Sequence, residues 1–342
     1  MGGVLQHQFL TSTYLYESHN QDEQASSELL DTEPMSPSCK PVDTTVKRNT
    51  RLSSFHSYRI LRAVKQRGMS HVYKAVYNGA HGFQCPVAIK MATSIPQTAR
   101  LIHQEARLLS EASGPHLPRV YDTGRLDDTP YFSMEWIDGL SLRTILKTTA
   151  IPIPVLIDLM IQLCDALGAL HGATTPIIHR DIKPANIMVS PRGHLTLVDL
   201  GISGHIGHLR DTSSYGTVAY MAPEQLQHGP LTPQTDMFSM GAILFELLAR
   251  RRLYTGTVPQ ILVQRLQTTT ETYCHAIEQH IPQTHRVLTP LLFHCLQSER
   301  EKRPESVEVI REVLCTLMHP IHAKSCARKW WSQQRVRRAL HS

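Results

Sequence analysis

Hydrophobic and polar residues alternate along residues 58–91, a period of two that predicts β-strands. Three strands are expected in this segment, over residues 58–64, 71–77 and 86–91. Over residues 97–113 apolar residues recur at helical spacing around an acid near the centre, Glu105. Two more strands are predicted at residues 120–122 and 131–136. This first region should therefore be a mostly antiparallel sheet accompanied by one helix.

Helices dominate the prediction after a break at Asp138-Gly139. The most apolar stretch, residues 151–170, has prolines and acids among apolar residues at helical spacing, which favours a core helix over a membrane span. Two short strands, 187–189 and 195–198, are expected around a turn at residues 191–193. Further helices are predicted over residues 236–248, 258–266, 287–296 and 306–318. The chain should thus be of the α+β class.

The two ends of the chain differ in composition from its middle. Residues 1–51 are rich in Ser, Thr, Gln and acids with little periodicity, so we expect a disordered acidic tail. Residues 319–342 carry basic residues and no acid, together with Trp330-Trp331. For this basic tail we favour a short helix that packs its tryptophans on the large lobe. Contact with an anionic membrane surface, nucleic acid or the acidic tail is the alternative.

Overall composition restricts the class of protein and its setting. A net charge of +6 and 19% charged residues are ordinary for a soluble protein, so no nucleic-acid partner is expected. The seven cysteines show no paired spacing, and no basic start followed by a long apolar run marks a secretory signal. We therefore expect a reduced, cytoplasmic setting.

A short polar segment lies between apolar runs near the middle of the chain. It contains Asp181, Lys183 and Asn186, and Asp199 follows the second short strand. Two carboxylates and an amide can supply oxygen ligands for Mg²⁺ and leave one carboxylate to accept a proton. The lysine adds positive charge where a transferring phosphoryl group gathers negative charge. Any one of these residues alone would fit an ordinary polar turn, but the ordered set indicates phosphoryl transfer.

These residues belong to a longer ordered series of motifs. The series is Val87-Ala88-Ile89-Lys90, Glu105, His179-Arg180-Asp181, Asp199-Leu200-Gly201, Gly216-Thr217, Ala222-Pro223-Glu224, Asp236 and Arg303-Pro304. This series of motifs resembles the motifs of eukaryotic-type (Hanks-type) protein Ser/Thr kinases. The residues within the motifs are most similar to those of the soluble bacterial members. The resemblance spans residues 55–318. It implies a two-lobed fold, with an antiparallel-sheet N-lobe (55–137) carrying one key helix and a large helical C-lobe (138–318).

The resemblance also implies an activity and catalytic roles. The γ-phosphate of ATP would pass to Ser or Thr hydroxyls of protein substrates. Lys90 would hold the α- and β-phosphates and pair with Glu105, Asp181 would accept the hydroxyl proton, and Lys183 would touch the γ-phosphate. Mg²⁺ would be bound by Asn186 and Asp199. The residues implied around the adenine and phosphates of ATP are Val72, Ala88, Met188, Met134, Glu135, Ile137 and Gly68.

Three further features follow from the resemblance. Glu224 and Arg303 would form a buried pair, and Asp236 would bind the backbone of the catalytic loop. Arg180 would collect a phosphate placed on the activation segment, with Thr212, Ser213 and Ser214 as acceptors. Self-association of two copies would allow this autophosphorylation in trans.

The chain departs from the family pattern at the loop expected to cover the phosphates. Lys65, Arg67 and Ser70 stand where glycines are expected, and only Gly68 agrees. Side chains there could stiffen the loop or weaken ATP binding, while their charge could compensate. Leu200 replaces a phenylalanine, a swap that should still fill a packing column with Leu109 and His179. We expect an active kinase, with a pseudokinase scaffold and a small-molecule phosphotransferase as the alternatives.

Overall fold

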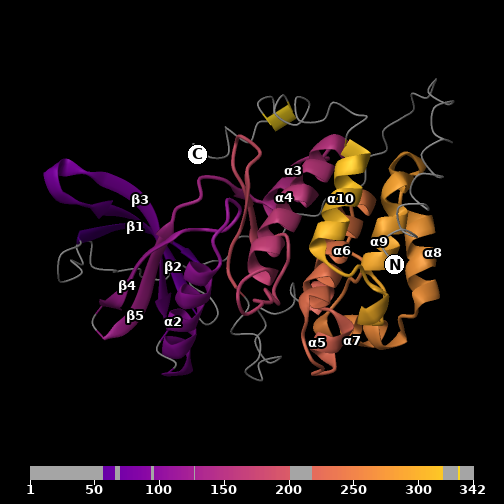
Figure 1. Cartoon of the computed structure of the whole chain (residues 1–342), viewed down its shortest axis with the longest axis horizontal. Coiled ribbons are helices and arrows are strands. Elements are labelled where there is room, and N and C mark those ends of the chain that lie inside the picture. The colour runs from indigo at the N-terminus through magenta and orange to yellow at the C-terminus, as the bar shows by residue number, and fades with distance from the viewer. Residues whose placement is uncertain are drawn as a thin grey trace, which may run out of the picture.

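A sheet-rich lobe and a helical lobe follow one another along the chain, as the computed structural model shows (Figure 1). The structure describes residues 57–65, 70–93, 96–126, 128–200, 218–318 and 330–331. The predicted two-lobed α+β architecture is confirmed. The expectations for residues 1–51 and for most of 319–342, and those for Gly68 and for Thr212, Ser213 and Ser214, lie outside the described residues.

The N-lobe is a five-stranded antiparallel sheet of order β1-β2-β3-β5-β4. Its strands are β1 (Ser57–Lys65), β2 (Ser70–Asn78), β3 (Gln84–Ala92), β4 (Val120–Leu126) and β5 (Thr129–Glu135). Helix α2 (Pro96–Glu111) contacts β3, β4 and β5. Each of the five predicted strands and the predicted helix is present.

The side-chain period of strand β3 places its residues in two different environments. Val87 and Ile89 are buried with Tyr58 and Tyr131 in a small cluster on one face of the sheet. Ala88 belongs to the main core on the other face. Because successive side chains of a strand point to opposite faces, residue 90 shares the face of residue 88. Lys90 is therefore aimed at the side of the sheet that α2 covers.

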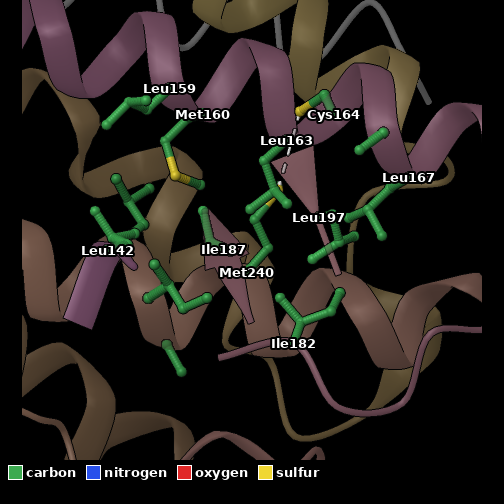
Figure 2. Close-up of a cluster of buried hydrophobic side chains, with 14 of the residues drawn as sticks. Leu142, Leu159, Met160, Leu163, Cys164, Leu167, Ile182, Ile187, Leu197 and Met240 are labelled. Carbon is green, nitrogen blue, oxygen red and sulfur yellow. Dashed lines mark hydrogen bonds between the residues drawn. The ribbon is translucent and has the colours of Figure 1, made fainter. Parts of the chain in front are cut away.

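The C-lobe is built around helix α4 (Ile153–His171), which contacts α6 (Pro233–Ala249), α10 (Val307–Met318) and the short strand β8 (Leu195–Leu197). In Figure 2, Leu163 and Leu167 of α4 point toward Ile187 and Leu197. Among the described residues, α4 is the one helix with the length and hydropathy of a membrane span. Its residues fill the core of the lobe, so the prediction of a core helix is confirmed.

The other helices of the C-lobe correspond only partly to the predictions. They are α3 (Leu142–Thr148), α5 (Pro223–Leu226), α7 (Val258–Gln267), α8 (Thr270–His280) and α9 (Thr289–Cys295). Helices α3, α5 and α8 had not been predicted. Helix α8 buries Tyr273 and Ile277, too few apolar positions to reveal its period. The helix predicted at residues 287–296 begins instead as a 3-10 turn over Gln283–Leu288.

The tryptophans of the basic tail lie on the large lobe. Trp331 is helical, 1% exposed and part of the main core, and Trp330 packs against that core. A Cβ added to Gly193, in the turn after strand β7 (Ile187–Val189), would lie 2.4 Å from Trp331 Cδ1. The expected packing of this pair is therefore confirmed.

Candidate active site

A small sheet brings the polar residues of the central segment together. Strands β6 (Leu140–Ser141), β7 and β8 form it, and β7 and β8 are antiparallel with Ile187 opposite Leu197. In such a hairpin the residue before the first strand lies beside the residues that follow the second. Accordingly, the Val198 amide donates to the Asn186 carbonyl at 2.9 Å. Asn186 and Asp199 thus emerge at the same end of the hairpin.

Asp181 is held by two side chains of its own loop. Lys183 Nζ donates to both carboxylate oxygens of Asp181, at 2.9 and 2.7 Å. Asn186 Nδ2 donates to the backbone carbonyl and to Oδ2 of Asp181, each at 2.9 Å. The Asp181 side chain keeps 23% of its surface exposed. The carboxylate is therefore oriented but still accessible to a substrate.

Two buried ion pairs of Lys90 join strand β3 to helix α2 and to Asp199. Lys90 Nζ lies 2.6 Å from Glu105 Oε1 and 2.9 Å from Asp199 Oδ1. Burial alone would lower the pKa of Lys90, but the two carboxylates outweigh it and raise that pKa above its ordinary value. Burial alone would likewise raise the pKa of Asp199, yet the neighbouring lysines hold it far below its usual range. Asp199 is therefore an ionised oxygen donor at neutral pH.

A second lysine reaches Asp199 from the N-lobe. Lys65, the last residue of β1, places Nζ 3.3 Å from Asp199 Oδ2, and half of its side chain is exposed. The two carboxylate oxygens of Asp199 thus accept hydrogen bonds from two different lysines. Sequence reasoning noted Lys65 as a departure at a glycine position but did not foresee this contact.

Asp236 supports the catalytic loop from inside the C-lobe. Its carboxylate is fully buried and accepts from the backbone amides of His179, at 2.8 Å, and Arg180, at 2.9 Å. The Arg180 carbonyl in turn accepts from Gln225 Nε2 at 2.8 Å. Arg180 has a φ of 69°, a conformation that costs a non-glycine residue energy and persists only where neighbours impose it. The predicted role of Asp236 is confirmed.

Arg303 and Glu224 form the predicted buried pair. The guanidinium makes two parallel hydrogen bonds to the carboxylate, Nη1 to Oε1 at 2.7 Å and Nη2 to Oε2 at 2.9 Å. The Arg303 side chain has no exposed surface. Such paired bonds fix the relative orientation of two segments 79 positions apart, the start of α5 and the end of the C-lobe.

Four of the residues predicted around the nucleotide, Val72, Ala88, Met134 and Glu135, lie on strands β2, β3 and β5, which are neighbours in the N-lobe sheet. Ala88 is opposite Met134 across β3 and β5, and Val87 is opposite Glu135. Val72, Ala88 and Met134 are all buried in the main core. Met188, in β7, is half-buried, as are Glu135 and Ile137. The packing column residues Leu109, His179 and Leu200 are each at most 5% exposed.

The chain is similar in sequence to known protein kinases. Residues 58–315 match the protein kinase domain. The chain is similar to a probable serine/threonine-protein kinase of Clostridium perfringens, with 34% identity over 59% of this chain and 29% of that protein. It is similar to serine/threonine-protein kinase PrkC of Bacillus subtilis, with 31% identity over 62% of this chain and 34% of that protein. Tyrosine-protein kinase MasK of Myxococcus xanthus is 27% identical over 60% of this chain and 34% of its own length. The chain thus spans about a third of the length of these relatives.

Proposed function

This chain belongs to the protein kinase domain family, and from that premise we propose that it transfers the γ-phosphate of ATP to Ser or Thr hydroxyls of proteins. The family implies ATP, a divalent metal and protein substrates. The observation that carries the proposal is the convergence of Lys90, Glu105 and Asp199 beside a loop that presents Asp181. Buried polar contacts hold this arrangement in both lobes. Glu105 holds Lys90 in the N-lobe, and Asp236 holds the backbone of the catalytic loop in the C-lobe.

In the proposed reaction Asp181 accepts the proton of the substrate hydroxyl. Its contacts with Lys183 and Asn186 hold the carboxylate in one orientation. Lys183 would turn to the γ-phosphate and offset the charge that develops there. Lys90, kept in place by Glu105, would bind the phosphates nearer the adenine.

The metal site would be formed by Asn186 and Asp199. Asn186 uses Nδ2 on Asp181, so its amide oxygen is the atom suited to a metal, and Asp199 supplies an ionised carboxylate. An oxygen-only donor set fits Mg²⁺, which we propose as the metal. Bound there, it would neutralise charge on the β- and γ-phosphates. Both side chains thus offer oxygen donors to a metal, which supports an enzyme over a scaffold without catalysis.

The reaction is tested with the purified full chain, labelled ATP, Mg²⁺ and a generic protein substrate. Lys90→Met and Asp181→Asn should each reduce phosphate transfer by at least a hundredfold, and the label should appear on Ser or Thr. Arg107→Met is the matched control, because Arg107 is highly exposed on α2 and should leave transfer unchanged. Equal transfer by all variants would show a contaminating kinase, and no transfer by the wild type would point to the scaffold. Label on tyrosine would refute the proposed specificity.

We also propose that the activation segment is autophosphorylated, in trans between two copies. Among the described residues, Arg180 Nε is buried without a hydrogen-bond partner, which suits it to receive a phosphate. Wild-type protein mixed with tagged Asp181→Asn protein should phosphorylate the tagged chain at Thr212, Ser213 or Ser214, as read by mass spectrometry. Phosphate confined to the untagged chain would exclude reaction in trans.

A further inference from the structure

Lys65 is brought to the site by irregular pairing of strand β1. The pairing begins with Ser57 opposite Asn78, and its regular continuation would place Lys65 opposite Ser70. Two register shifts, between Ile60 and Arg62 and between Ala63 and Lys65, instead place Lys65 opposite Val72. Irregularities of this kind redirect side chains and are frequent beside active sites. They move Lys65 two positions along β2.

The new position aligns Lys65 with Lys90. Val72 is opposite Lys65 on one side and opposite Lys90 on the other. Residues that are opposite each other in an antiparallel sheet project from the same face. The two lysines therefore stand in one row across three strands, and they contact the two oxygens of the same carboxylate, that of Asp199.

The two contacts with Asp199 differ in strength. The Lys90 side chain is 6% exposed and also bonded to Glu105, so its ion pairs are buried. The Lys65 side chain is 50% exposed, and an ion pair with so much solvent around it contributes little to stability. Lys65 can therefore leave Asp199 at little cost, whereas Lys90 is fixed.

We propose that Lys65 is a second phosphate-binding cation, which releases Asp199 to the metal and binds the outer phosphates of ATP. This inference rests on the proposed function, because Lys90 and Asp199 bracket the place where that function puts the triphosphate. A lysine ammonium donates charge-assisted hydrogen bonds to phosphate oxygens. Lys65 would in this way replace the close backbone approach that glycines provide in a phosphate-covering loop.

The test is the affinity of the full chain for ATP, ADP and adenosine, measured by calorimetry at a fixed, saturating Mg²⁺ concentration. Lys65→Met should weaken ATP binding roughly tenfold, the loss expected for one hydrogen bond to a charged group. ADP should be affected less, and adenosine not at all. Lys65→Arg should keep most of the ATP affinity. Arg59→Met is the control, because Arg59 is exposed on the same strand and opposite Val76, far along β1 from the site.

Each other outcome overturns the inference. Equal weakening of ATP and adenosine would make Lys65 a packing residue of the nucleotide pocket. Unchanged ATP affinity, with tighter Mg²⁺ binding by Lys65→Met in a separate titration of the metal, would make Lys65 only a competitor of the metal at Asp199. Lys90→Met separates these results from failure of the proposed function: ATP binding that depends on Lys90 but not on Lys65 refutes the inference alone. A wild type that binds no ATP refutes both.

Discussion

Replacing Arg303 with methionine should destabilise the C-lobe more than any surface charge change. Arg303 is fully buried and satisfies acceptors from several segments at once. Besides Glu224, they are the backbone carbonyls of Gln234, Gln297 and Ser298. Methionine keeps much of the volume of the side chain but supplies no donor. The variant would therefore leave a buried carboxylate and buried carbonyls without their main partner.

The size of the effect can be worked from these contacts. Removing one partner of a buried ion pair costs about 3–5 kcal/mol, because the remaining charge stays buried. Glu224 retains a hydrogen bond from Thr235 Oγ1 at 2.9 Å, which offsets a part of that cost. For a domain of this size each kcal/mol lowers Tm by roughly 2–4 °C. We therefore expect Arg303→Met to lower Tm by about 10 °C.

Thermal and urea unfolding of the full chain, followed by circular dichroism, would measure this loss. Lys302→Met is the matched control: Lys302 is 59% exposed, bonds the nearby Glu299, and should cost at most about 1 kcal/mol. A double-mutant cycle with Glu224→Gln isolates the pair, since its two losses should not add. Additive losses, or equal losses from Arg303→Met and Lys302→Met, would refute the reasoning.

The stability that the pair of Arg303 and Glu224 contributes depends on pH. Burial would raise the pKa of Glu224, but the Arg303 guanidinium outweighs it and lowers that pKa below its ordinary value. A carboxyl whose folded pKa is depressed stabilises the fold above its unfolded pKa and loses that contribution as pH falls through the folded value. The stability difference between wild type and Arg303→Met should therefore narrow below about pH 4.

The remaining predictions concern the tail and a histidine. Trp331→Ala should lower the free energy of unfolding by about 3–5 kcal/mol in urea, and Trp330→Ala by less, because only Trp331 is fully buried. Gly193→Ala should cost at least about 1 kcal/mol in the same assay, since Gly193 has a φ of 81° and an added Cβ would meet the Trp331 ring. Burial lowers the pKa of His116, so stability should fall as pH drops below about 6.5. His116→Gln should flatten this fall in pH-dependent melts, and an unchanged slope would contradict the assignment.

The sequence predicted features that depend on residue type and local period. Lys90 on an apolar strand and Glu105 on the next helix are visible in the sequence, but it is the resemblance to protein kinases that implies their pairing. Asp236 and the pair of Glu224 with Arg303 were likewise assigned before the structure, from the order of motifs. The partners come from the resemblance, and burial explains why each contact holds, since a charged residue in apolar surroundings needs a partner.

The features that escaped prediction depend on register and backbone conformation. The pattern of β1 shows which residues alternate, but the register shifts that bring Lys65 opposite Val72 arise from pairing with β2. The left-handed conformation of Arg180 is similarly imposed by Asp236 and Gln225, which lie 56 and 45 positions away. Long-range contacts of this kind leave no local trace in the sequence.

The ion pairs of the site suggest how a nucleotide could bind, because each charge that loses its present partner would gain a new one. Asp181 is paired with Lys183, and Asp199 with Lys65 and Lys90. A metal and a triphosphate arriving together can take over these pairings, the metal on carboxylates and the phosphates on lysines. Metal alone would displace lysines without giving them an anion, which is costly where the site is buried. Under the proposed function, the pairings therefore favour binding of ATP and metal as one complex, and the half-exposed Lys65 is the contact that would break first.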